Sequence, residues 1–256
     1  MRARFVTLVN QKGGVGKTTT AVSLAAALGR RGEKVLLIDL DPQANATSAL
    51  GVDGVDRRGI YDALLDEVSI EDCIVHVPEE KLDLVPSSRE LSGAEVELVP
   101  QMARERRLTS AMAPIRDRYD WVLVDCPPSL GLLTINALTA SDSVIIPVQC
   151  EYMALEGLSR LMETLDLVRR NLNPGLTLLG VVLTMFDKRT RLSQQVVDEV
   201  RGHFAETFET IIPRSVRLSE APSHGHSIFL YEGGGRSAAA YDSLAAELLA
   251  RVGVAV

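Results

Sequence analysis

Short apolar runs and longer amphipathic segments alternate along most of the chain. The runs are rich in Val, Ile and Leu at consecutive positions, a pattern that predicts strands buried on both faces of a parallel sheet. The predicted strands span residues 5–9, 34–39, 82–86, 121–125, 143–148 and 178–184. A further short strand is predicted at residues 210–212.

Between these runs, apolar residues recur every three or four positions, which predicts helices with one buried face. The predicted helices span residues 18–31, 100–118, 154–171, 192–208 and 237–252. Strands that alternate with helices predict an α/β fold, with a doubly wound and mostly parallel sheet flanked by helices. Ligands bind such sheets where strands end and helices begin, so residues directly after strands are the first functional candidates.

The strongest chemical signal follows the first predicted strand. Residues 10–20 are Asn-Gln-Lys-Gly-Gly-Val-Gly-Lys-Thr-Thr-Thr, and a helix rich in Ala and Leu follows. Glycines let backbone N–H groups turn inward, and the helix N-terminus adds positive potential where phosphates bind. Lys17 is predicted to reach the outer phosphates and the Thr18 hydroxyl to coordinate Mg²⁺. The predicted nucleotide-binding residues are Lys12, Gly13, Gly14, Val15, Gly16, Lys17, Thr18 and Thr19.

Carboxylates follow two of the other predicted strands. Asp39 and Asp41 end the second strand, and alternation places both on the same side of the chain. Asp125 follows four apolar residues, an arrangement in which the carboxylate holds Mg²⁺ through water. An apolar strand ending in one acid is weak evidence alone, and solvated strand-end acids are the alternative. The preceding phosphate loop favours the metal site.

Composition limits the remaining choices. The 256 residues are 46% hydrophobic, so one globular domain over residues 1–256 is expected. Three widely spaced cysteines, Cys73, Cys126 and Cys150, suggest neither a disulfide framework nor a CxxC metal site, and we expect them to be reduced and structural. The first apolar run ends too early for a signal peptide, which predicts a cytoplasmic protein. With a net charge of -7, any DNA contact requires a local basic patch.

The phosphate loop departs from the common pattern, which has a Gly where Gln11 stands. This departure resembles the deviant loop KGGxGK[ST] of the ParA and MinD group of ATPases, whose extra lysine corresponds to Lys12. Three stretches are similar to the chromosomal ParA or Soj branch of that group, and the resemblance covers nearly the whole chain. They are DLDPQANATSALG at 39–51, PVQCEYMALEGL at 147–158 and IPRSVRLSEAPSHG at 212–225.

The resemblance implies an ATP-dependent switch for chromosome or plasmid segregation, with ATP and Mg²⁺ as cofactors. It implies a homodimer when ATP is bound, nonspecific binding to double-stranded DNA, and slow hydrolysis until a ParB-type centromere-binding protein stimulates it. We expect no N-terminal helix-turn-helix domain, because the phosphate loop lies so close to Met1. The expected location is cytoplasmic and nucleoid-associated.

Roles for individual residues are also implied by the resemblance. Lys12 crosses the dimer interface to the partner's nucleotide, and with Lys17 and Asp41 it makes up the implied catalytic set. Asp41 positions the attacking water, while Asp39 supports the loop lysine or the metal shell. The implied metal-site residues are Thr18, Asp39 and, through water, Asp125.

Two further groups are implied near the other strand ends. Met185, Pro213 and Ser215 are expected near the adenine, although Ser215 replaces the Asn common there. The implied DNA-binding residues are Lys188, Arg189, Arg191, Arg214 and Arg217. Because arginines that contact the DNA backbone carry no base information, binding is expected to be independent of sequence. His224 and His226 suggest a metal only weakly, since no third ligand is nearby.

Other functions remain open alternatives. A MinD-like, membrane-associated positioning ATPase would end in a basic amphipathic helix, but residues 244–256 contain one basic residue, Arg251. No membrane binding is therefore expected. Nitrogenase-like and cluster-carrier proteins need paired cysteines at a dimer interface, which Cys73, Cys126 and Cys150 do not suggest. A noncatalytic nucleotide-binding scaffold is the third alternative, and Asp41 argues against it.

Overall fold

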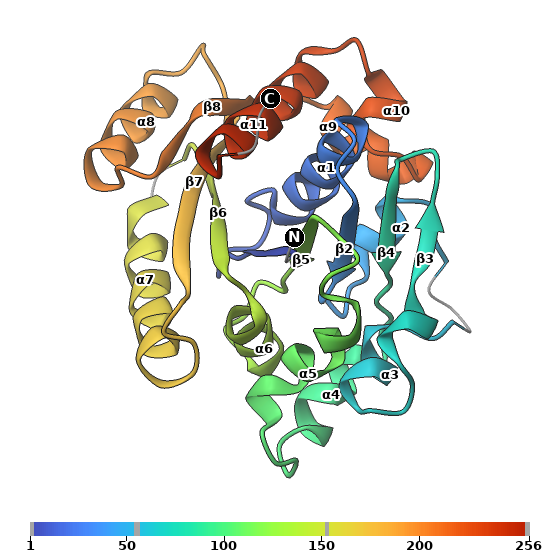
Figure 1. Ribbon diagram of the computed structural model, residues 1–256. Helices are drawn as coiled ribbons and strands as arrows, with labels where there is room; N and C mark the ends of the chain where they lie inside the picture. The colour runs from blue at the N-terminus through green and yellow to red at the C-terminus, as the bar shows by residue number, and fades with distance from the viewer. Residues whose placement is uncertain (1–2, 54–56, 152–153, 254–256) are drawn as a thin grey trace.

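The computed structural model describes residues 3–53, 57–151 and 154–253, and in these residues one eight-stranded sheet forms the centre of the molecule (Figure 1). The order is β3-β4-β2-β5-β1-β6-β7-β8. Only β3 pairs antiparallel with its neighbour among the described strands. The strands are β1 (Arg4–Leu8), β2 (Val35–Asp39), β3 (Val75–Val77), β4 (Leu82–Val85), β5 (Trp121–Asp125), β6 (Ser143–Gln149), β7 (Thr177–Phe186) and β8 (Thr207–Pro213).

Helices cover both faces of the sheet, as Figure 1 shows. The long helices α1 (Lys17–Arg30) and α11 (Arg236–Arg251) pack on one face. The opposite face carries α3 (Ile60–Leu64), α4 (Leu91–Glu97), α5 (Arg107–Met112), α6 (Leu132–Ala140), α7 (Ala154–Asn171) and α8 (Arg191–His203). The remaining short helices are α2 (Asn45–Ala49), α9 (Arg217–Glu220) and α10 (Ile228–Glu232). This arrangement confirms the predicted doubly wound α/β fold.

Alternation along β2 explains why its first four residues are all apolar. Val35 and Leu37 join the core beneath α1 and α11, while Leu36 and Ile38 join the core on the opposite face. All five residues of the strand are buried. Successive side chains of a strand point to opposite faces, so a strand with helices on both sides needs apolar residues throughout.

Two of the predicted helices are wrong in part. Residues 100–118 do not form one helix, because α5 is flanked by 3₁₀ turns at Arg104–Arg106 and Ala113–Ile115. Ala103 has a left-handed φ of 53°, and Pro114 lacks the N–H that a helix interior needs. The helix predicted at 192–208 ends at His203, and β8 begins at Thr207, so the strand predicted at 210–212 is longer than expected. Phe208 fits the helical spacing but is buried in this edge strand.

The strand order brings the functional candidates to one edge. β1 lies between β5 and β6, and β2 pairs with β5 on the other side of β5. In the parallel register, Asp39 lies directly beside Asp125. The loop after β1 therefore opens between the carboxyl ends that carry the predicted acids.

The end of α1 packs against the turn between β3 and β4 at Gly29, and this contact predicts an effect on stability. A Cβ at Gly29 would overlap the backbone carbonyl oxygen of Lys81, so Gly29→Ala forces the hairpin away from the helix. We expect the free energy of unfolding to fall by about 1–3 kcal/mol, the usual cost of overpacking. Urea unfolding measures this change.

Gly202→Ala is the matched control, because Gly202 also lies in a helix, α8, and a Cβ there meets no atom within 4 Å. This variant should be more stable by about 0.5–1 kcal/mol, since alanine loses less backbone entropy than glycine on folding. Equal effects of the two substitutions would show that the packing of Gly29 is not the cause.

Candidate functional site

The loop between β1 and α1 has the conformation that phosphate binding requires. Gly14 and Gly16 have left-handed φ values of 73° and 87°, which glycine adopts without strain. The Lys17 ammonium donates to the Lys12 carbonyl oxygen at 3.2 Å, across the loop. The Thr184 hydroxyl donates to the Val15 carbonyl oxygen at 2.8 Å and ties the loop to β7. The loop thus curls over the N-terminus of α1, where backbone N–H groups are free to bind an anion.

A hydrogen bond fixes the backbone of Lys12, whereas its side chain is exposed. Its N–H donates to the Asn10 side-chain oxygen at 3.0 Å, and the Asn10 amide donates to the Pro147 carbonyl at 2.8 Å. Within the described part of the chain, the Lys12 ammonium makes no hydrogen bond or ion pair. Lys17, in contrast, is only 7% exposed and points into the loop.

The three predicted carboxylates are buried at the carboxyl ends of β2 and β5. Asp39 is fully buried and accepts hydrogen bonds from the Thr47 N–H at 2.8 Å, the Thr47 hydroxyl at 2.7 Å and the Asp41 N–H at 3.2 Å. Burial raises the pKa of Asp39 to about 6, and the three donors act in the opposite direction. Asp41 is 6% exposed and accepts from the Gln43 N–H at 2.9 Å.

Asp125 differs from Asp39 because neither of its buried carboxylate oxygens has a hydrogen-bond partner among the described residues. Burial, and then the neighbouring Asp39, raise the pKa of Asp125 well above its usual range, while Thr18 and Lys17 lower it. The pKa of Lys17 is lowered by burial, against the attraction of Asp125.

These unpartnered oxygens fit a Mg²⁺ site. Magnesium prefers oxygen ligands and keeps several of its waters, and those waters would donate to the free oxygens of Asp125. Thr18, which acts on the pKa of Asp125, supplies a hydroxyl from the first turn of α1. The residues present therefore suit a hydrated divalent cation.

A cavity of about 470 Å³ lies beside the phosphate loop, and the three predicted adenine residues line it together. Met185 follows the buried part of β7 with a left-handed φ of 53°, while Pro213 ends β8 and Ser215 follows it. Gly16 and Thr19 of the phosphate loop line the same cavity. The cavity therefore adjoins the predicted phosphate loop, as the predicted adenine site requires.

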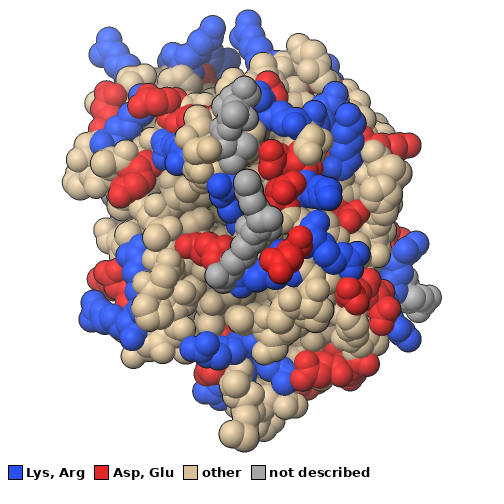
Figure 2. Space-filling view, in the orientation of Figure 1, with Lys and Arg blue, Asp and Glu red and all other residues tan. Residues whose placement is uncertain are grey.

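The predicted DNA-binding residues lie between β7 and the start of α8 and between β8 and the start of α9, and three of them are ion-paired. Arg189 contacts Asp187 at 2.7 Å, Arg214 contacts Glu151 at 2.8 Å, and Arg217 contacts Glu220 at 2.9 Å. Lys188 and Arg191 are exposed and make no ion pair within the described residues. Over the described residues of the face in Figure 2, Lys and Arg alternate with Asp and Glu, and no broad basic field is visible.

The other candidates have structural roles. Cys73, Cys126 and Cys150 are free and buried, as expected. Burial raises the pKa of Cys73 to about 11 and that of Cys150 to about 12. His224 stacks on Tyr231, with ring centroids 5.0 Å apart. Among the described residues, no group of three or more His, Cys, Asp or Glu is placed to hold a metal by itself.

Thr47, Ser87 and Thr184 hold the site together, and the sequence did not identify them. The Thr47 hydroxyl donates to Asp39 and accepts from the Ser87 N–H at 2.9 Å, and the Ser87 hydroxyl donates to the Asp41 carbonyl at 2.8 Å. Ser87 follows the end of β4, so its place after a strand was the available signal. Thr47 gives no such signal, because it lies within α2.

We expect substitution by asparagine to have opposite effects on stability at Asp39 and at Asp125. Asp125→Asn removes a buried carboxylate whose burial and neighbouring Asp39 outweigh the stabilising effect of Thr18 and Lys17, so we expect the nucleotide-free protein to gain about 1 kcal/mol of stability. Asp39→Asn places an amide group against the donors of Thr47 or Asp41 and should cost about 1–3 kcal/mol. Urea unfolding in EDTA measures both.

Mg-ADP provides the second readout for these variants. It should raise the unfolding midpoint of the wild type, and this gain should disappear in Asp125→Asn. A loss of stability in nucleotide-free Asp125→Asn as large as that in Asp39→Asn would contradict the unpartnered state of the Asp125 carboxylate.

Comparison with known proteins identifies the family. A family model described as an AAA domain matches residues 3–178. The chain is 53% identical to the sporulation initiation inhibitor protein Soj of Bacillus subtilis, over 96% of this chain and 98% of the relative. It is 52% identical to the chromosome partitioning protein ParA of Myxococcus xanthus, over 97% of this chain and 88% of the relative.

A solved structure is similar along the whole fold. The cobyrinic acid a,c-diamide synthase of Mycobacterium smegmatis, with bound ADP and magnesium, superposes with a TM-score of 0.85 at 36% identity. The match covers 98% of this chain and 96% of that chain. Within the residues that the structure describes, no helix is long and apolar enough to span a membrane. The deviant phosphate loop, the buried acids and these relatives together show that the chain belongs to the ParA/Soj family of partitioning ATPases.

Proposed function

We propose that this protein hydrolyses ATP as a timed switch for DNA segregation. The observation that carries the proposal is the convergence of Lys17, Asp41 and the unpartnered oxygens of Asp125 at the phosphate loop. The relatives at 52% and 48% identity are named chromosome partitioning proteins, whereas the structure named as a diamide synthase is 36% identical. The greater identity favours segregation over amide synthesis.

Phosphoryl transfer depends mainly on positioning and on stabilising charge that develops on the γ-phosphate. Lys17 is buried against the loop, where low dielectric strengthens its interaction with phosphate oxygens. The Asp41 carboxylate, anchored by the Gln43 N–H, is the group that orients the attacking water. Mg²⁺, held by Thr18 and through water by Asp125, supplies positive charge to the phosphates when bound.

Lys12 acts in trans in this proposal. Its side chain is exposed and makes no polar contact with the described residues of its own chain, while its backbone is fixed by Asn10. An ammonium group held in this way is available to a nucleotide bound by a second copy. ATP binding therefore joins two subunits with the nucleotides between them, and hydrolysis separates them.

The proposed dimer binds double-stranded DNA through Lys188, Arg189, Arg191, Arg214 and Arg217 of each subunit. These residues follow β7 and β8 or begin the helices α8 and α9, and one of them, Arg214, also lines the base cavity. Contacts with phosphates give binding without sequence preference and carry the protein onto the nucleoid in the cytoplasm. A ParB-type centromere-binding protein stimulates hydrolysis and releases the DNA. The whole of residues 1–256 acts as one ATPase domain.

Binding to a random-sequence DNA duplex across a salt series tests the proposal. We expect binding by the wild type only with Mg-ATP, with an affinity that falls steeply as salt rises because counterions are released. Lys12→Ala should lose both the ATP-dependent dimer in sedimentation and DNA binding. Arg217→Ala should bind weakly and lower the salt slope by about one unit per lost phosphate contact.

Arg118→Ala is the matched control for Arg217→Ala. The side chains of Arg118 and Arg217 are each 53% exposed. Arg118 is ion-paired with Glu71 at 2.6 Å, and Arg217 with Glu220 at 2.9 Å and more distantly with Glu232 at 3.5 Å. Arg118 precedes β5 and lines a surface at the amino ends of the strands, opposite the nucleotide site. Equal losses in both variants would sink the proposed DNA surface. Binding of the wild type to anionic vesicles instead of DNA would favour a membrane-positioning ATPase.

A further inference from the structure

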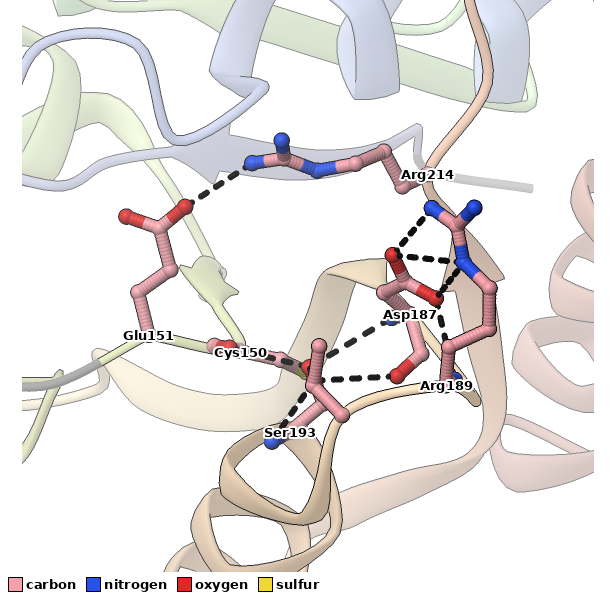
Figure 3. Close-up of polar contacts among 7 residues, drawn as sticks. Cys150, Glu151, Asp187, Arg189, Ser193 and Arg214 are labelled. Atoms are coloured by element: carbon pink, nitrogen blue, oxygen red, sulfur yellow. Dashed lines mark hydrogen bonds and ion pairs between the residues drawn. The ribbon is translucent and has the colours of Figure 1, made fainter.

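An ion pair joins the end of β6 to the proposed DNA surface. Glu151 follows β6, and its carboxylate contacts the Arg214 guanidinium at 2.8 Å, as Figure 3 shows. The two side chains are 45% and 56% exposed, so the pair lies at the surface, where a DNA phosphate can compete for the arginine. A phosphate that approaches Arg214 must displace Glu151 and also meets repulsion from its negative charge.

Arg214 and the residue before Glu151 are both hydrogen-bonded to β7 through their backbones. The N–H of Cys150, the residue before Glu151, donates to the Thr184 carbonyl at 3.0 Å. The Arg214 N–H donates to the Phe186 carbonyl at 2.9 Å. Thr184 in turn holds the phosphate loop, because its hydroxyl donates to the Val15 carbonyl at 2.8 Å. A short path of hydrogen bonds thus connects the phosphate loop with the backbone that carries Glu151.

A second ion pair belongs to the same cluster. Asp187 binds Arg189 through both carboxylate oxygens, at 2.9 Å to Nε and 2.7 Å to Nη2. Ser193 links Cys150 with Asp187, because its hydroxyl donates to the Cys150 carbonyl at 3.3 Å and accepts from the Asp187 N–H at 3.4 Å (Figure 3). Arg189, and to a smaller extent Arg214, lower the pKa of Asp187. The two arginines therefore share one local set of acids.

We propose that Glu151 is a nucleotide-linked determinant of DNA affinity, which competes with DNA phosphates for Arg214. Nucleotide at the phosphate loop shifts this competition through Val15, Thr184 and Cys150, so that Glu151 releases Arg214 in the ATP-bound dimer. The inference rests on the proposed function, because it concerns the same DNA surface. It adds a residue that weakens binding in the absence of ATP, whereas the basic residues strengthen binding in its presence.

Glu151→Gln tests the inference, since it removes the charge and keeps nearly the same shape. We measure the affinity for a random-sequence duplex without nucleotide, with Mg-ADP and with Mg-ATP at one salt concentration. Without nucleotide and with Mg-ADP, the variant should bind about two- to fivefold more tightly than the wild type, the range that one exposed ion pair can supply. With Mg-ATP the affinities of the variant and the wild type should differ less. The ratio of the DNA affinity with Mg-ATP to that with Mg-ADP should therefore be smaller in the variant than in the wild type.

Glu71→Gln is the matched control. Glu71 pairs with Arg118 at 2.6 Å, and the two are 47% and 53% exposed, close to the values for Glu151 and Arg214. The control changes the net charge by the same amount, far from the proposed surface, and should leave DNA affinity unchanged. In the double variant Glu151→Gln/Arg214→Ala, the gain from Glu151→Gln should disappear if the acid acts through that arginine.

The outcomes separate this inference from the function on which it rests. A wild type that does not bind DNA with Mg-ATP overturns the proposed function. If the wild type binds but Glu151→Gln has unchanged affinity in all three states, or gains equally in all three, the nucleotide-linked role of Glu151 is wrong. The same gain in Glu71→Gln, or a gain that persists without Arg214, also overturns it, because the effect is then one of net charge.

Discussion

The parallel register between β2 and β5 places Asp39 beside Asp125, both fully buried, at the edge where the phosphate loop opens. Two adjacent carboxylates with little water around them repel each other, and removing each from water is unfavourable. Asp39 is stabilised by three hydrogen-bond donors, but Asp125 has none within the described residues. The site therefore contains a buried carboxylate whose unpartnered oxygens suit a hydrated cation.

Lys17 supplies part of the positive charge that balances these acids, although burial of its own ammonium group is unfavourable. Burial lowers the pKa of its ammonium while Asp125 raises it, so the lysine and the acids depend on each other. A phosphate group with its metal ion would bring both a partner for Lys17 and water donors for Asp125. The fold thus keeps an electrostatic imbalance at the site, which ligand binding relieves and which links nucleotide to the stability of this edge of the sheet.

The carboxyl end of β7 connects the two proposed binding regions. Thr184 contacts the phosphate loop, Met185 lines the base cavity, and Phe186 pairs with the backbone of Arg214. Nucleotide and DNA surfaces that share one strand end can influence each other through a few hydrogen bonds, without a change in the rest of the sheet. The left-handed backbone of Met185 lies in this stretch, and strained residues of this kind are typical of functional positions.

The sequence predicted every described strand except β3, and it predicted the phosphate loop, because both depend on local patterns: apolar runs between helices, and glycines before Lys17. It could not predict that Thr47 and Ser87 support the acids, because those hydrogen bonds join β2, α2 and the end of β4. It also identified the arginines without their acidic partners. Arg214 and Glu151 are 63 residues apart, and only the fold brings them together. This pairing is compatible with both the acidic net charge and the proposed DNA surface, because arginines that are neutralised locally carry little attraction for DNA while their acidic partners stay in place.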